Sequence, residues 1–147
     1  AGGVAAHAGI PLTHCDFEQS CLFVTGHLED GSFDLDWPML ARARQTVVIY
    51  MGLSGLAEIC AQLIAHGLPA DWPAAVVSHG TQAAQRAVCA TLGTLADAVT
   101  RAGLASPCLT IVGEVVRLRD ELSWFEARAD AAPLRATLLE PCLSANR

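Results

Sequence analysis

The chain has 147 residues, of which 52% are apolar and 16% charged, and its formal net charge is -6. This length supports one globular domain with its own core. No apolar run reaches the roughly 18 residues of a membrane-spanning helix, and the acidic balance lacks the basic face that nucleic-acid binding requires. We therefore expect a cytoplasmic protein with no nucleic-acid or membrane partner. The opening letters AGGVAAHAGIPLTH, without an initiator Met, indicate a piece of a longer protein.

The first expected elements are short. Residues 21–25 are mostly apolar and predict a strand that could pair antiparallel with a neighbour. Residues 30–36 form a polar turn region, and Trp37-Pro38 begins a short helix that continues through Leu40. None of these segments has the composition of a domain linker.

The most regular strand and helix follow each other near the middle of the chain. β-branched side chains at 46–49 predict a buried strand that leads to Tyr50 and Met51. Ser54 is expected to cap the first turn of the next helix, and Gly67 is expected to stop that helix. The apolar stripe of the helix consists of Leu56, Ile59, Cys60, Leu63 and Ile64.

The second half of the chain continues the alternation of strand and helix. Residues 74–78 predict a strand, and the polar residues 82–86 predict a short helical segment after it. Residues 87–92 could extend that helix or form a strand. A further helix is expected to end at Gly103, and residues 108–112 predict another strand.

Strands that alternate with helices predict an α/β fold with a mixed β-sheet flanked by helices. Ligands of open α/β sheets lie outside the carboxyl ends of the strands. Residues 50–53 and 78–81 both fit this position, and each segment contains a glycine that would let the backbone approach a ligand closely. Residues 115–122 carry Arg and acidic side chains at helical spacing and predict a surface helix.

The titratable residues do not predict a metal site or a catalytic group. No two of the five histidines are three or four residues apart, and the six cysteines include no C-x-x-C pair. His14 and His27 stand beside turn residues and are the histidines most expected to face a cleft, whereas His66 is expected to be structural or on the surface. Three cysteines in apolar runs are expected to be buried thiols: Cys60, Cys89 and Cys108.

Two short motifs, Gly9-Ile10-Pro11-Leu12-Thr13-His14 and Tyr50-Met51-Gly52-Leu53, begin an ordered series that resembles uroporphyrinogen-III C-methyltransferase, the methylase module of siroheme synthase. The resemblance identifies residues 1–126 with the C-terminal half of that two-domain methylase and leaves 127–147 as a C-terminal extension. Further landmarks of the series are Thr25-Gly26-His27, Leu35-Asp36-Trp37, Gly80-Thr81, Gln85-Arg86 and Ile111-Val112-Gly113-Glu114.

The resemblance implies the C-terminal domain of the tetrapyrrole (class III) methylase fold and a homodimer. It also implies transfer of methyl groups from S-adenosyl-L-methionine to uroporphyrinogen III, which gives precorrin-2 for siroheme, cobalamin or heme d1 biosynthesis. Met51 and Gly80 match cofactor-binding positions of the family, and His14 and His27 match substrate-binding positions. The family usually has Arg where this chain has Cys15, and a thiol lacks the fixed charge that can hold a substrate carboxylate.

Two hypotheses follow from these features. In the first, the chain is the C-terminal part of the methyltransferase and has negligible activity without the other half. In the second, the chain is a non-catalytic truncated domain that only folds, dimerises or binds a ligand, and Cys15 favours this alternative. A methylase that acts at another ring position of a tetrapyrrole fits residues 9–14 and 50–53 less well.

Overall fold

A mixed five-stranded sheet forms the centre of the molecule, with the strand order β1-β2-β5-β3-β4. The computed structural model describes residues 1–26 and 35–122. The pair β1–β2 is parallel, and the other three neighbouring pairs are antiparallel. The strands are β1 (Ser20–Thr25), β2 (Gln45–Tyr50), β3 (Pro73–Ser78), β4 (Arg86–Thr91) and β5 (Cys108–Val112).

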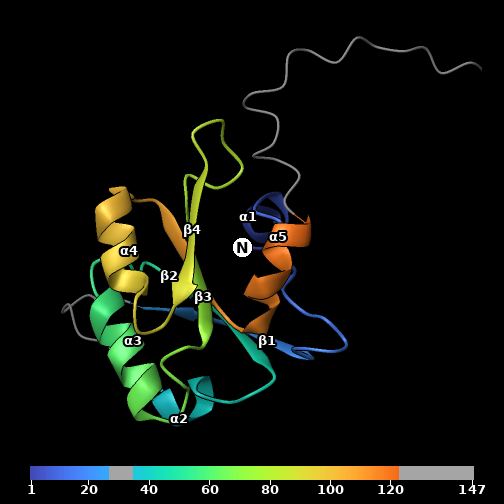
Figure 1. Ribbon diagram of the computed structural model, residues 1–147, viewed down its shortest axis with the longest axis vertical. Helices are drawn as coiled ribbons and strands as arrows, with labels where there is room; N and C mark the ends of the chain where they lie inside the picture. Colours follow the sequence, from blue (N-terminus) through green and yellow to red (C-terminus); the bar gives the residue numbers. More distant parts are fainter. Residues whose placement is uncertain (27–34, 123–147) are drawn as a thin grey trace, which may run out of the picture.

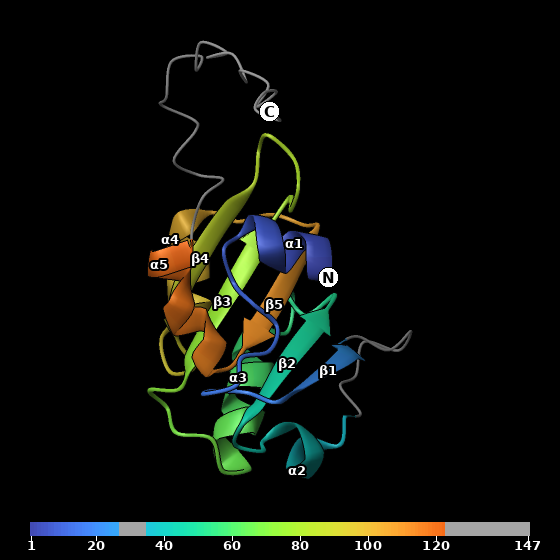
Figure 2. The same ribbon diagram turned by 90° about the vertical axis from the view of Figure 1, so that its right-hand side faces the viewer.

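Helices cover both faces of this sheet (Figures 1 and 2). On one face, α2 (Trp37–Leu40), α3 (Leu56–Ala65) and α4 (Leu95–Ala102) enclose a core cluster with alternate residues of the strands. On the other face, α1 (Gly2–His7) and the 3-10 helix η1 (Glu114–Leu118) enclose a second cluster, and α5 (Arg119–Leu122) follows η1. The predicted α/β class, with a mixed sheet between helices, is confirmed.

The alternation of side chains along β2 explains why the core has two parts. Val47 and Ile49 belong to the cluster beneath α3, whereas Val48 belongs to the cluster beneath α1. The strand is therefore apolar on both faces, as the run of β-branched residues predicts. The predicted strands at 74–78 and 108–112 are also confirmed, and they correspond to β3 and β5.

The polar helical segment predicted at residues 82–86 is wrong. Residues 79–85 form the loop of a hairpin, because β3 and β4 pair antiparallel with Ser78 opposite Arg86. The loop makes turn hydrogen bonds, including one from Gln85 N to Gln82 O at 2.9 Å. Of the two alternatives for residues 87–92, the strand is correct. Long-range pairing with β3 thus outweighs the local helical spacing.

Four other expectations need correction. The strand at 21–25 pairs parallel with β2, and the connection between these strands has the length that a crossover needs. The N-cap of α3 is Gly55, and no side-chain hydrogen bond caps the helix, so Ser54 is not its cap. The predicted surface helix at 115–122 begins as η1, in which Val115 and Val116 are buried against the sheet. Cys89 is exposed, because it lies on the edge strand β4.

Candidate functional site

The carboxyl ends of β2 and β3 lie at the same edge of the sheet. Both strands pair antiparallel to β5, which runs between them, so β2 and β3 point in the same direction. The two segments predicted to bind a ligand, residues 50–53 and 78–81, therefore meet at one edge. The segment 105–108 arrives at this edge as well, because β5 begins there.

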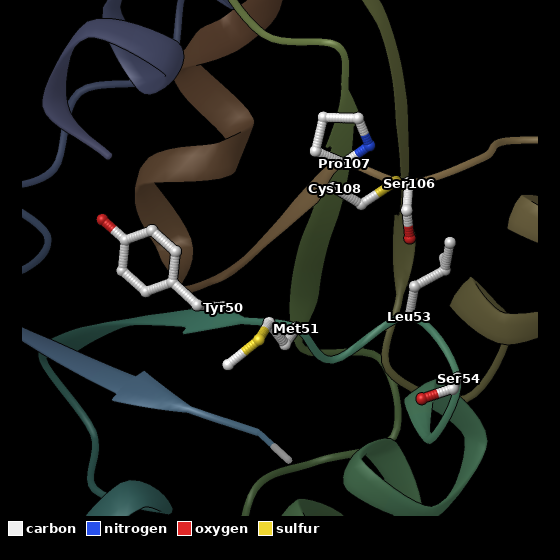
Figure 3. Close-up of a pocket in the computed structure, with 7 residues that line it drawn as sticks. All are labelled: Tyr50, Met51, Leu53, Ser54, Ser106, Pro107 and Cys108. Atoms are coloured by element: carbon white, nitrogen blue, oxygen red, sulfur yellow. The ribbon is translucent and has the colours of Figure 1, made fainter.

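A pocket of about 520 Å³ opens at this edge (Figure 3). One side is formed by the turn between β2 and α3, and the other by the residues that lead into β5. Its lining residues are Tyr50, Met51, Leu53, Ser54, Ser106, Pro107 and Cys108. No member of this lining set carries a formal charge at neutral pH, so the pocket suits an uncharged or weakly polar part of a ligand.

A smaller pocket of about 170 Å³ adjoins the first one. The two pockets share Tyr50, Pro107 and Cys108, and the smaller one is also lined by Gly80. The structure therefore brings Met51 and Gly80, which are 29 positions apart in the numbering, to neighbouring pockets at one edge of the sheet.

Backbone conformation at this edge is unusual on both sides. Met51 has φ 52°, and its side chain leaves the sheet and is 61% exposed. His79 and Thr81 in the hairpin loop have φ values of 50° and 69°. Non-glycine residues in the left-handed region cost conformational energy and concentrate at functional sites. The sharp turn after β2 is held by a hydrogen bond from Gly26 N to Tyr50 O at 2.7 Å.

The glycines at this edge make room for protein atoms, which differs from the expectation that they admit a ligand. A Cβ added at Gly52 would lie 3.1 Å from atoms of both Ile49 and Ile59, beneath the turn. A Cβ added at Gly80 would lie 2.9 Å from the Cβ of Val4 in α1. Both glycines therefore allow close packing behind the pockets.

The predicted substrate-binding residue His14 lies at the opposite edge of the sheet. Its backbone N donates to Glu18 O at 2.8 Å, and the carboxylate of Glu18 accepts from the backbone N of Val115, just beyond the carboxyl end of β5. His14 is therefore not part of the pocket that contains Met51. His27, the other predicted substrate-binding residue, lies outside the described residues.

His14, Cys15 and Asp16 form an exposed turn whose ligand atoms lie within 4.8 Å of one another. The Nδ1 atom of His14 accepts from Asp16 N at 3.2 Å and lies 3.8 Å from Asp16 Oδ2. Nothing in the sequence indicated this group, because its residues are adjacent and lack the usual spacing of metal ligands. His66 lines neither of the two pockets described above, and its ring stacks on Trp37 at a centroid distance of 6.4 Å.

Sequence reasoning missed two parts of the architecture around the site. Ser106, Pro107 and Cys108 form one wall of the pocket, although no motif marks them; the antiparallel direction of β5 is what brings them to this edge. Burial raises the pKa of the Cys108 thiol. Glu18 is wholly buried, and nothing in the sequence distinguishes it from a surface carboxylate.

The comparison with known families decides the identity of this fold. Residues 1–96 match the family model of the tetrapyrrole (corrin/porphyrin) methylases. The chain belongs to this family. Within the described residues, no helix of this methylase domain is long and apolar enough to cross a membrane.

Curated relatives of the methylase domain are siroheme synthases. The domain is 62% identical over 125 residues to the siroheme synthase of Methylobacillus flagellatus and 61% identical over 126 residues to that of Nitrosospira multiformis. These matches cover 85% and 86% of this chain but only 27% of each relative. The chain thus spans about a quarter of the length of these relatives.

A solved structure also resembles the methylase domain. The uroporphyrin-III C-methyl transferase of Thermus thermophilus, crystallised with S-adenyl homocysteine, has a TM-score of 0.67 and 31% identity. The match covers 78% of this chain and 50% of the Thermus protein. The methylase domain therefore corresponds in extent to half of that enzyme.

Proposed function

We propose that the chain is the C-terminal part of an S-adenosyl-L-methionine-dependent uroporphyrinogen-III C-methyltransferase. The observation that carries this proposal is the pair of adjoining pockets that contains Met51 and Gly80, the two positions that match cofactor-binding residues of the family. The high identity to siroheme synthases supports the same assignment. The whole enzyme would methylate uroporphyrinogen III to precorrin-2 in porphyrin biosynthesis, in the cytoplasm and as a homodimer.

The chemistry of the larger pocket fits the cofactor. S-Adenosyl-L-methionine supplies an electrophilic methyl group, and the uncharged lining formed by Met51, Leu53 and Pro107 can contact its apolar surfaces. The turn after β2 also presents backbone groups that no longer belong to the sheet, and these can hydrogen-bond the polar atoms of a nucleoside. The Thermus relative was crystallised with S-adenyl homocysteine.

The contribution of this chain to methyl transfer is positional. Bound S-adenosyl-L-methionine would supply the methyl group from its positively charged sulfur. The pyrrole carbon would provide the electron pair for the new bond, the sulfur would leave as a neutral thioether, and the tetrapyrrole would take up the positive charge and lose it as a proton. The residues around Met51 and Pro107 would hold the cofactor in one orientation and keep water from one side of it. Correct orientation of two reactants can supply roughly 7–11 kcal/mol of barrier reduction.

Binding of S-adenosylhomocysteine tests the cofactor part of the proposal. Calorimetry should detect binding by the unmodified chain and at least about fivefold weaker binding by Met51→Ala, because apolar contact worth about 1 kcal/mol is lost. The matched control is Met39→Ala, which truncates the other methionine, in α2, away from the pocket. Equal affinities of both variants would contradict the assignment of Met51.

An activity assay tests whether the chain is only part of the catalytic unit. With uroporphyrinogen III and isotopically labelled S-adenosyl-L-methionine, the isolated chain should show no methyl transfer above background, since a tetrapyrrole needs further surfaces to bind. Measurable turnover would contradict the proposal that the active centre extends beyond this chain.

The second candidate function is a non-catalytic domain that only folds, dimerises or binds a ligand. The exposed thiol of Cys15 favours it, because this position offers no positive charge to a polyanionic substrate. If the missing charge limits substrate binding, Cys15→Arg should raise the affinity for uroporphyrin III, measured by fluorescence, and leave the affinity for S-adenosylhomocysteine unchanged. No gain in tetrapyrrole affinity would contradict a substrate contact at position 15.

A further inference from the structure

Ser78 is the last residue of β3, and its side chain is buried although it is polar. The residue is 2% exposed and does not line either pocket at this edge of the sheet. Its hydroxyl oxygen lies 2.5 Å from Ala105 O and 2.8 Å from Nδ1 of His79. The hydroxyl therefore joins the end of β3 to the segment that enters β5.

The direction of each hydrogen bond around the Ser78 hydroxyl follows from which atoms can carry a proton. A carbonyl oxygen cannot donate, so the single proton of the Ser78 hydroxyl goes to Ala105 O. The hydroxyl oxygen then accepts from Nδ1 of His79, which must carry a proton. His79 N makes a third link to the same segment by donating to Pro107 O at 2.9 Å.

The three hydrogen bonds of Ser78 and His79 together form a clamp on residues 105–107. The segment that they hold forms one wall of the larger pocket. Ser106, Pro107 and Cys108 face the turn after β2 across the opening, as Figure 3 shows. Hydrogen bonds hold this wall on both sides of Ser106: the Ser78 hydroxyl donates to Ala105 O, and the His79 amide donates to Pro107 O. A shift of this segment would change the width of the pocket at Met51.

We propose that Ser78 is a positioning residue of the cofactor pocket: its buried hydroxyl fixes residues 105–107 and so sets the shape of the wall opposite Met51. This inference rests on the proposed function for the identity of the ligand, S-adenosyl-L-methionine. The clamp itself is a property of the folded chain and can be measured without the ligand.

The test compares Ser78→Ala with Ser78→Thr, which keeps a hydroxyl, and with Thr46→Val as a matched control. Thr46 is another buried hydroxyl of the same sheet, at the opposite edge, and it has no hydrogen-bond partner among the described residues. Thr46→Val therefore removes a buried hydroxyl without touching the clamp. Ser78→Cys, which keeps a weak donor, replaces Ser78→Ala if the latter does not fold.

The first measurement is amide hydrogen exchange of the unliganded chain. The amide of His79 should exchange at least about tenfold faster in Ser78→Ala, while an amide in the middle of β2, such as that of Val48, reports the change in global stability. Ser78→Thr and Thr46→Val should leave the His79 amide protected. Unchanged protection of this amide in Ser78→Ala, relative to Val48, would overturn the inference whatever the ligand is.

The second measurement is the dissociation constant of S-adenosylhomocysteine by calorimetry. Loss of the clamp should weaken binding about fivefold to tenfold in Ser78→Ala, in line with one or two hydrogen bonds, and Ser78→Thr should restore it to within about twofold. Equal affinity of Ser78→Ala and the unmodified chain would overturn the inference. Absence of binding by the unmodified chain would instead count against the proposed function, and the exchange data would then decide on the clamp alone.

Discussion

Glu18 shows how one buried carboxylate organises the edge of the sheet opposite the pockets. It has no exposed surface, and its two carboxylate oxygens accept the backbone N–H groups of Glu114 and Val115 at the start of η1. These amides have no partner within the helix, so the side chain satisfies them from outside. Burial nevertheless raises the pKa of Glu18 above its usual value, because the loss of hydration outweighs the two hydrogen bonds.

The raised pKa of Glu18 predicts a specific pH dependence of stability. Because the folded chain binds this proton more tightly than the unfolded chain, the contribution of Glu18 to the free energy of unfolding decreases as the pH rises from about 4.5 through the folded pKa. Urea unfolding at several pH values between 4 and 7 should show this decrease in the difference between the unmodified chain and Glu18→Gln. A difference that grows with pH, or stays constant, would contradict the raised pKa.

At the scale of elements, α1 packs on the loop that joins β3 to β4. Val4 lies against Gly80, where any side chain would collide with both methyl groups of the valine. Ala5 and Ala8 of the same region are buried in the core cluster beneath α1. The short helix is thus held by tertiary contacts, which agrees with the rule that a helix of this length has little stability of its own.

Gly80→Ala should therefore lower the free energy of unfolding by about 2 kcal/mol, because the added Cβ forces α1 away from the loop. Val4→Ala in the same chain should recover about half of this loss, since the Cβ of Val4 remains 2.9 Å from the new atom. Gly2→Ala is the control, as a Cβ at Gly2 meets no atom within 4 Å. Additive effects of Gly80→Ala and Val4→Ala in denaturant unfolding would show that the two residues are not in contact.

Helix α1 also shows where prediction from sequence fails. Two consecutive glycines, Gly2 and Gly3, disfavour a helix, and α1 was not predicted. The segment 82–86 failed in the opposite direction, since its helical spacing lost to the pairing of β4 with β3. The strand β2 and helix α3 were predicted because their apolar patterns, in continuous and helical spacing, match their burial. Patterns of burial can be recognised along the sequence, whereas tertiary contacts that stabilise a segment of low intrinsic propensity cannot.

At the scale of the whole molecule, the core cluster between α3 and the sheet buries Cys60 on the inner face of α3. Its thiol is 4% exposed, and burial raises its pKa to about 11 from the model-compound value of 9.0. Cys15, in contrast, lies exposed on the turn that also contains His14 and Asp16. The relative reactivity of the Cys15 and Cys60 thiols therefore reports whether the chain is folded.

Alkylation of the folded chain with iodoacetamide at pH 8 should modify Cys15 well before Cys60. The higher pKa alone lowers the thiolate fraction of Cys60 about a hundredfold, and burial slows the reaction further. Peptide mass spectrometry at timed intervals measures both rates, and in concentrated urea the rates should become similar. Equal rates in the folded chain would contradict the burial of α3 against the sheet.

The sequence by itself determined the α/β class, the mixed sheet, four of the five strands as buried or half-buried runs, and the family to which the chain belongs. These features follow from local apolar patterns and from short motifs in a fixed order. Only the tertiary structure decided that Met51 and Gly80 adjoin, that Ser106 to Cys108 complete the pocket, and that His14 lies at the other edge. The reason is that strand direction and order depend on long-range hydrogen bonds, which no local pattern encodes.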